Sequence, residues 1–149
     1  MFIEDTLYRE ILNVMPIPTV DILFLSLENK ILLGKRDNEP LAWIYYIPGG
    51  RVNKWETSLE TAKRKAKEEL GIDIDVKKLS FLWVYDDIFE NSVFGGISTH
   101  CIPVTYIYRL SWNEERMISP SDNQHSDLRF FPIDDPSLHH MVKVRLKSL

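Results

Sequence analysis

The chain has 149 residues, of which 44% are hydrophobic and 27% charged, and this composition indicates one globular domain over residues 1–149, long enough to bury a core. A formal net charge of −4 argues against a nucleic-acid-binding surface, apolar runs of only strand length argue against a membrane span, and the acidic, amphipathic N-terminus does not resemble a signal peptide. The single cysteine, Cys101, cannot form an internal disulfide, so we expect a cytoplasmic protein without nucleic-acid or membrane partners.

Hydrophobic periodicity predicts a helix, a hairpin and a short strand in the first third of the chain. The helix covers Phe2–Val14 and ends at the prolines that follow. Two apolar runs, Thr19–Leu27 and Ile31–Lys35, lie on either side of a short polar turn and predict a β-hairpin. The aromatic run Trp43–Ile47 predicts a strand, which Pro48-Gly49-Gly50 ends.

The remaining two thirds contain the clearest helix and several further strands. The helix covers Thr57–Leu70, with Thr57 or Ser58 as its N-cap and Gly71 directly after its last turn. Strand-like runs follow at Ile72–Val76, Leu79–Asp86, His100–Leu110 and Asp127–Ile133. A second amphipathic helix is expected at Pro136–Leu146. Strands with helices before, between and after them predict an α+β or α/β fold in which a mixed sheet lies between helices.

The helix expected at Thr57–Leu70 places charged side chains beside its apolar stripe. A helical wheel puts Lys65 and Glu69 on one flank of the stripe formed by Leu59, Ala62, Ala66 and Leu70. A glutamate in this position, next to the Gly49-Gly50 turn, is suited to a hard cation such as Mg²⁺, which takes oxygen ligands. The alternative is a solvated helix whose ion pairs contribute only about 0.2–0.5 kcal/mol each. The composition of the helix alone favours this alternative.

The spacing of residues 50–72 reverses that preference. These 23 residues match the pattern G-x5-E-x7-R-E-U-x-E-E-x-G-U, in which U is apolar, at every fixed position except one. The matching residues are Gly50, Glu56, Arg64, Ala66, Glu68, Glu69, Gly71 and Ile72. Lys65 stands where the pattern has a glutamate. A match of this length rarely arises by chance, and the chain therefore resembles the Nudix hydrolase family.

The resemblance implies a Nudix fold and a metal-dependent hydrolase. In the family, glutamates of the box bind one or more Mg²⁺ ions, and water attacks a phosphorus of a nucleoside diphosphate derivative. Lys65 changes the local charge by about two units one helical turn before Glu69, which should weaken a cluster of several metal ions. We therefore expect one Mg²⁺ or Mn²⁺ ion on Glu69.

Segments outside the box resemble one branch of the family, the GDP-mannose mannosyl hydrolases. These segments are Leu32–Arg36, Pro48–Val52, Tyr85–Asp87, Thr99-His100 and Gln124-His125. Enzymes of this branch also depart from the full box, and they attack C1 of the sugar with inversion, releasing GDP and mannose. They form homodimers, so the resemblance implies a homodimer that acts on a nucleotide sugar.

The resemblance to this branch assigns expected roles to individual residues. The expected metal ligands are the Gly49 carbonyl, Glu69 and Gln124, and Glu68 joins them if the attack is at phosphorus. His125 is the expected general base. Arg36 and Arg51 are expected to hold the diphosphate. Arg64 is expected to orient carboxylates, and Asp21 is expected to contact the substrate.

Other interpretations of the same residues stay open. His125 lies in ordinary loop composition and, without the resemblance, is most simply a surface residue. Cys101 and Trp83 depart from the branch, which has tyrosine and histidine at or near those positions. Two further hypotheses are a Nudix pyrophosphatase that cleaves at phosphorus with Glu68 and Glu69, and a non-catalytic nucleotide-sensing domain that Lys65 favours.

Overall fold

The computed structural model describes residues 1–118 and 125–149, with His125 and Ser126 described by their backbone alone. Helices and turns of helix are α1 Asp5–Val14, α2 Ser58–Leu70, the 3-10 helix η1 Val76–Lys78, α3 Trp112–Met117 and α4 His140–Leu146. Strands are β1 Ile17–Leu25, β2 Ile31–Arg36, β3 Tyr45–Tyr46, β4 Gly49–Arg51, β5 Ser80–Val84, β6 Asp87–Phe89, β7 Thr99–Arg109 and β8 His125–Phe131. In these ranges no helix is long and apolar enough to cross a membrane.

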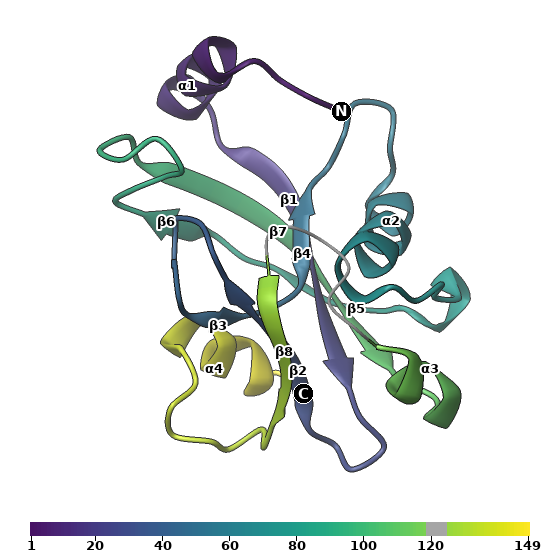
Figure 1. Cartoon of the computed structure of the whole chain (residues 1–149). Coiled ribbons are helices and arrows are strands. Elements are labelled where there is room, and N and C mark those ends of the chain that lie inside the picture. The colour runs from purple at the N-terminus through teal and green to yellow at the C-terminus, as the bar shows by residue number, and fades with distance from the viewer. Residues whose placement is uncertain (119–124) are drawn as a thin grey trace.

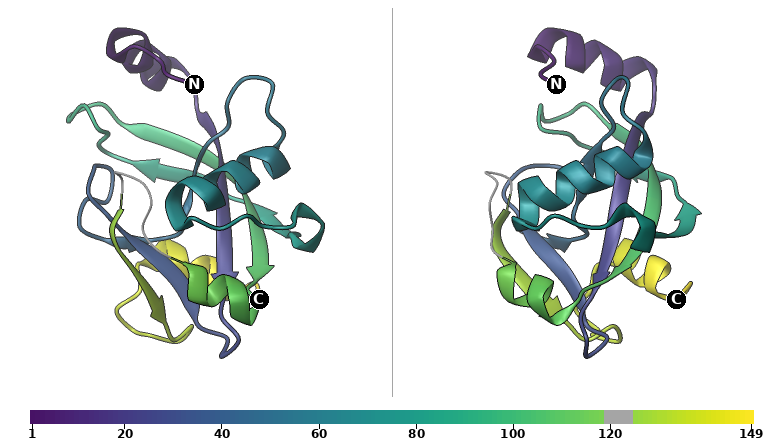
Figure 2. Two further views of the ribbon diagram at one scale, coloured as in Figure 1. Left: turned by 45° about the vertical axis from the view of Figure 1, so that its right-hand side comes forward. Right: turned by 90° about the vertical axis from the view of Figure 1, so that its right-hand side faces the viewer.

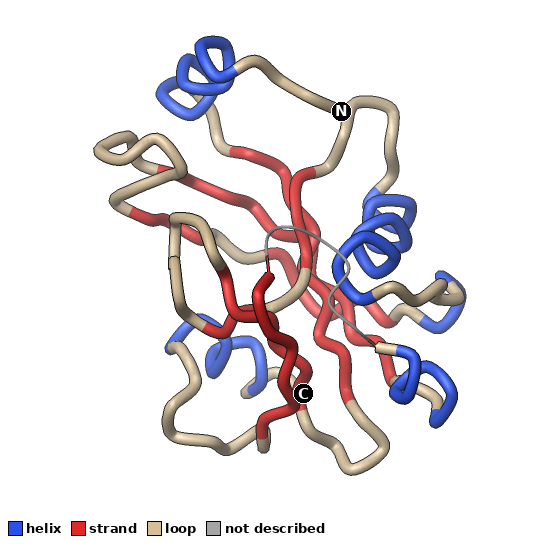
Figure 3. The backbone as a smooth tube through the Cα atoms, viewed as in Figure 1, coloured by secondary structure: helices blue, strands red, loops and turns tan. Residues whose placement is uncertain are grey.

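The strands form one mixed sheet at the centre of the molecule (Figures 1 and 3). Its main path runs β3-β2-β1-β7-β5, with β4 paired to β1, β6 to β7 and β8 to β2. β1 and β7 run parallel over nine residue pairs, from Ile17 with Cys101 to Leu25 with Arg109, whereas the other described pairings between strands are antiparallel. The parallel pair β1 and β7 therefore forms the centre of the sheet, and the other strands extend the sheet on either side of it.

Alternation along β1 divides the core into two layers, because successive side chains of a strand point to opposite faces. Val20, Ile22 and Phe24 pack against the apolar stripe of α2. Leu23 and Leu25 pack in the second core cluster, which contains Val142 of α4. Figure 2 shows α2 and α4 on opposite sides of the sheet. The expected mixed sheet between helices is confirmed.

Helix α2 begins and ends as its sequence indicates. Thr57 accepts a hydrogen bond from the Glu60 backbone N–H, and the Glu60 carboxylate accepts one from the Thr57 backbone N–H, which completes a capping box. Gly71 adopts a left-handed conformation with φ 75°, which glycine tolerates without a Cβ clash. These caps fix the helix that carries the charged residues of the box.

Several element predictions need correction. The strand expected at Ile72–Val76 is wrong: Ile72 and Ile74 pack into the core below α2 without strand pairing, and η1 follows. Strands β4 and β6 are too short for their pattern to be recognised. Helix α3 carries a capping box between Ser111 and Glu114, a signal that the hydrophobic pattern did not reveal. The other expected helices and strands are present with shifted ends.

Candidate active site

A cavity of about 450 Å³ opens between the N-terminal part of the chain, β1, β4 and α2. Most of the expected site residues line it, together with Lys65: Asp21, Arg36, Gly49, Arg51, Arg64 and Glu68. Glu69 is fully buried and does not line the cavity. The fold thus gathers residues from β1, β2, β4 and α2 that are up to 47 positions apart, from Asp21 to Glu68, around one hollow.

Gly49 brings the backbone of β4 against β1. It pairs with Asp21, and a Cβ built on Gly49 would lie 2.1 Å from the Val20 carbonyl oxygen, a distance that no side chain tolerates. The absence of a side chain therefore permits the pairing. The Gly49 N–H donates to Glu69 Oε2 at 3.1 Å, so the glycine turn and the buried glutamate hold each other.

Arg64 organises the carboxylates at the cavity wall. Its guanidinium donates to both oxygens of Glu56 at 2.6 and 2.8 Å, to Glu68 and to the Arg51 carbonyl oxygen. The hydrogen bonds from Arg64 lower the pKa of Glu56 to about 2, against the opposing effect of burial. These contacts are those of a residue that orients carboxylates, the role expected for Arg64.

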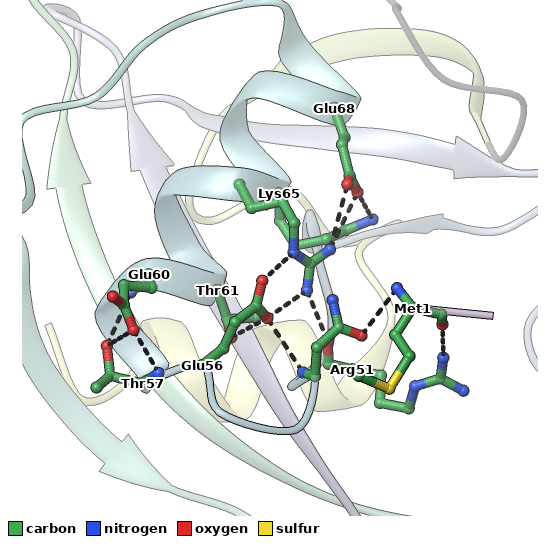
Figure 4. A network of polar contacts seen from close by, with 10 residues as sticks. Met1, Arg51, Glu56, Thr57, Glu60, Thr61, Lys65 and Glu68 are labelled. Atoms are coloured by element: carbon green, nitrogen blue, oxygen red, sulfur yellow. Dashed lines mark hydrogen bonds and ion pairs between the residues drawn. The ribbon is translucent and has the colours of Figure 1, made fainter. Parts of the chain in front are cut away.

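Lys65 lies inside the cluster, between two carboxylates. Its ammonium is 2.6 Å from Glu69 Oε1 and 3.2 Å from Glu68 Oε2, and its side chain is only 8% exposed. Figure 4 shows Lys65 joined to Glu68 on the same side of α2 as Glu56. Burial alone would lower the pKa of Lys65, but the attraction of Glu69 and Glu68 outweighs burial and raises it. The alternative of a solvated Lys65–Glu69 pair does not hold, because both side chains are buried, at 8% and 0% exposure.

The cation that lies between Glu68 and Glu69 of α2 is the Lys65 ammonium. In the part of the chain that the structure describes, no three histidine, cysteine or acidic side chains are arranged to hold a metal ion. Glu68 and Glu69 supply the oxygen ligands that Mg²⁺ prefers, but the Lys65 ammonium stands between them. A divalent ion on both carboxylates requires Lys65 to leave Glu69, because two cations repel strongly in a buried site.

Two arginines place positive charge at the cavity. Arg36 donates from Nε to the Pro40 carbonyl oxygen at 2.8 Å. Arg51 donates from Nη2 to the Met1 carbonyl oxygen at 2.8 Å, and its guanidinium lies 5.1 Å from the centre of the Tyr8 ring. Each arginine is thus held by one backbone carbonyl while its side chain lines the cavity, an arrangement suited to an anionic ligand.

Asp21 lies at the floor of the cavity in an ion pair that the sequence did not predict. Arg145 of α4 donates from one nitrogen to Asp21 at 2.9 Å and to Asp87 at 2.6 Å, and Tyr46 donates to Asp87 at 3.0 Å. Burial raises the pKa of Asp21 to about 7, although Arg145 opposes it. Arg145 is 1% exposed. The signal for this cluster was a charged residue at helical spacing from buried Val142, on the apolar face of α4.

The remaining candidates are placed differently. The backbone of His125 pairs with that of Arg36 in the β2–β8 ladder. Gln124 lies outside the described residues. Burial raises the pKa of Cys101 to about 12, which argues against a nucleophilic thiolate. Trp83 is 61% exposed on β5 and does not line the cavity.

Comparison with known proteins gives matches over nearly the whole chain. The NUDIX domain family matches residues 15–149. The low-salt glycan biosynthesis protein Agl8 of Haloferax volcanii is 32% identical over 148 residues, covering 99% of this chain and 90% of Agl8. An ADP-ribose pyrophosphatase of Methanocaldococcus jannaschii is 46% identical over 52 residues, covering 35% of this chain and 31% of that protein. The crystal structure of a MutT NUDIX hydrolase from Burkholderia pseudomallei superposes with a TM-score of 0.74 at 25% identity, covering 91% of this chain and 98% of that one.

Proposed function

Because this chain belongs to the Nudix family, we propose that it is a metal-dependent hydrolase of nucleotide sugars. The proposed reaction is GDP-mannose plus water to GDP plus mannose, with attack at C1 of the sugar. The observation that carries this proposal is that Arg36 and Arg51 line the same cavity as Glu68 of α2. Support also comes from the 32% identical Agl8, whose name places it in glycan biosynthesis.

The cavity charges suit the departure of a nucleoside diphosphate. As the bond between C1 and the diphosphate oxygen breaks, negative charge develops on that oxygen, and Arg36 and Arg51 are the proposed cations that receive it. A Mg²⁺ or Mn²⁺ ion held by Glu69, with the proposed Gly49 carbonyl and Gln124 ligands, would neutralise the same charge. No general acid is then required.

His125 is the proposed general base. Histidine has an unperturbed pKa of about 6.5, which suits removal of a proton from the attacking water near neutral pH. Support comes from the register of β8, in which the backbone of His125 pairs with that of Arg36, the residue proposed to bind the diphosphate. The proposed place for the sugar is the floor near Asp21, which lines the cavity.

A pyrophosphatase is the second candidate. A pyrophosphatase of this family would bind its metal ion through Glu68 and Glu69. Glu68 lines the cavity, which supports this candidate. The ADP-ribose pyrophosphatase match supports the same reading over its 52 residues. The third candidate is a non-catalytic nucleotide sensor. Lys65, at a position where the box has a glutamate, favours it, whereas the retained Arg64–Glu56 pair argues against it.

The remaining parts of the proposal concern assembly and location. From the resemblance to the mannosyl hydrolase branch, we propose a homodimer. We also propose that residues 1–149 form one domain and that the protein works in the cytoplasm without a nucleic-acid or membrane partner.

The products decide between these candidates. The protein is incubated with a panel of nucleotide sugars and Mg²⁺, and products are resolved by chromatography. GDP and free mannose are expected. GMP and mannose 1-phosphate would replace the proposal with the pyrophosphatase, and no turnover of any nucleotide sugar would favour the sensor. An identical incubation with a chelator is the control for metal dependence.

A further inference from the structure

A second buried carboxylate, that of Asp87, lies at the floor of the cavity. Asp87 begins β6 and pairs with Cys101 of β7, whereas Asp21 lies on β1, which pairs with the same strand β7. Both aspartates are buried, and both line the cavity together with Cys101. Strands β1 and β6 therefore bring two carboxylates to one place in the cavity wall.

Arg145 holds each of these carboxylates by one oxygen. Its Nη2 donates to Oδ2 of Asp21 at 2.9 Å and to Oδ2 of Asp87 at 2.6 Å, and the Tyr46 hydroxyl donates to the same oxygen of Asp87 at 3.0 Å. Among the described residues, Oδ1 of Asp21 and Oδ1 of Asp87 receive no hydrogen bond. Neither of these two oxygens is a fully enclosed atom, so both remain open to a ligand in the cavity.

The charge at the floor determines which part of a ligand can lie there. Asp21 and Asp87 share one guanidinium, so the group has a net charge of −1 and repels an anion. A purely apolar group would leave two carboxylate oxygens without hydrogen-bond donors in a buried place. Hydroxyl groups are neutral and donate hydrogen bonds, and a hexose carries them on neighbouring carbons. The floor therefore suits the sugar, and the arginine side of the cavity suits the diphosphate.

From this geometry we infer that Asp87 binds the sugar directly, accepting a hydrogen bond from one hexose hydroxyl while Asp21 accepts one from another. Arg145 is a positioning residue for both carboxylates, and its own Nη1 is fixed by the Met141 carbonyl oxygen at 3.1 Å. A hexose that lacks the hydroxyl bound by Asp87 leaves this acceptor unpaired and binds more weakly. The inference rests on the proposed action on nucleotide sugars and deepens it, because it assigns selection of the sugar to Asp87.

Nucleotide binding in the presence of a chelator tests the inference without turnover. Dissociation constants of GDP and GDP-mannose are measured by calorimetry for the wild type and for Asp87→Asn, which removes the charge with little change of shape. Asp87→Asn is expected to weaken GDP-mannose about tenfold and GDP less than about twofold, because a hydrogen bond to a charged acceptor is stronger than one to a neutral acceptor. A purely structural role of Asp87 would weaken both nucleotides alike.

Analogues of GDP-mannose that each lack one hydroxyl identify the contact. At least one analogue is expected to bind the wild type about tenfold more weakly than GDP-mannose does. For Asp87→Asn the same analogue and GDP-mannose should differ by less than about threefold, because the variant has already lost most of that interaction.

Asp86→Asn is the matched control. Asp86 precedes Asp87, but its side chain is mostly exposed, pairs with His100 and does not line the cavity. The variant makes the same charge change outside the cavity, and its affinities for GDP and GDP-mannose should stay within about twofold of those of the wild type.

Unchanged affinity of Asp87→Asn for GDP-mannose, or equal weakening of GDP and GDP-mannose, would overturn the inference. If Asp87→Asn does not fold, the wild type decides: a tenfold loss for at least one analogue would support the inference, and binding of every analogue within about threefold of GDP-mannose would overturn it. The products of turnover are read separately. GMP and mannose 1-phosphate would refute the proposed attack at C1 and leave the inference standing, whereas no binding of GDP-mannose to the wild type would refute both.

Discussion

The buried pair of Lys65 and Glu69 offers a quantitative test of the site's structure. In Lys65→Met, Glu69 keeps its hydrogen bond from the Gly49 N–H but loses the ammonium that lies 2.6 Å from its carboxylate. Glu69 is 0% exposed, so water cannot replace that cation. Breaking a buried pair by removing one partner costs about 3–5 kcal/mol, so Lys65→Met should lower the free energy of unfolding by about that amount. Glu69→Gln should cost slightly less, about 2–4 kcal/mol, because Lys65 keeps Glu68.

The double variant separates the pair from its surroundings. The double variant carries both Lys65→Met and Glu69→Gln, and neither position then holds a buried charge. The double variant should therefore lose less stability than the two single variants lose together. The expected coupling energy is about 2–3 kcal/mol. Unfolding is followed in urea with chelator present, so that no metal ion replaces the lysine.

A control pair joins the last turn of the same helix to the chain that follows it. Lys67 contacts Asp73 at 2.8 Å, but both side chains are more than half exposed. Solvent-exposed pairs contribute about 0.2–1 kcal/mol, and the cycle Lys67→Met with Asp73→Asn should therefore give a coupling near the lower end. A coupling below about 0.5 kcal/mol for Lys65 and Glu69 would refute the buried pair.

Three further outcomes are expected. Gly49→Ala should destabilise the fold by about 3 kcal/mol or more, measured by urea unfolding, because its Cβ would lie 2.1 Å from the Val20 carbonyl oxygen; a loss below about 1 kcal/mol would contradict the close approach. Arg64 holds the pKa of Glu56 at about 2, below its ordinary 4.5, so Glu56 contributes stability above pH 4.5 that is lost as the pH falls toward 2. The stability difference between wild type and Glu56→Gln, about 1–2 kcal/mol at pH 6 after allowance for partial exposure, should shrink over that window, and a constant difference would count against the assignment. His125→Gln should reduce turnover of the nucleotide sugar by about 10²–10⁴ with nearly unchanged binding, and a fall of less than about tenfold would argue against His125 as the base.

The helix of the box was predictable because its signals are local. Thr57, Glu60 and Gly71 act on backbone groups within a few residues, so their effects follow from the sequence. The order of helices before, between and after the strands was likewise sufficient to predict a sheet covered on both faces. Ile72 and Ile74 show the limit: an apolar run without a pairing partner packs into the core as irregular chain.

The site was predictable in its members and less so in its contacts. Spacing identified Lys65 as a departure, but its burial between Glu68 and Glu69 depends on how closely β4 approaches α2. That approach is a tertiary property set by Gly49 and Gly50. The helical spacing from Val142 marks Arg145 as a buried position, but its partners Asp21 and Asp87 could not be predicted, because they are 124 and 58 positions away.

The bond from Arg145 to two aspartates has an evolutionary consequence. One guanidinium joins the C-terminal helix to two strands. Losing Arg145 leaves two aspartates without their cation in a buried place, and losing either aspartate removes one of the two carboxylates that Arg145 binds. Substitutions at positions 21, 87 and 145 are therefore expected to be inherited together, as a compensated set. A hybrid protein that takes its last helix from a relative should retain its stability only when the two aspartates, or their replacements, come from the same parent.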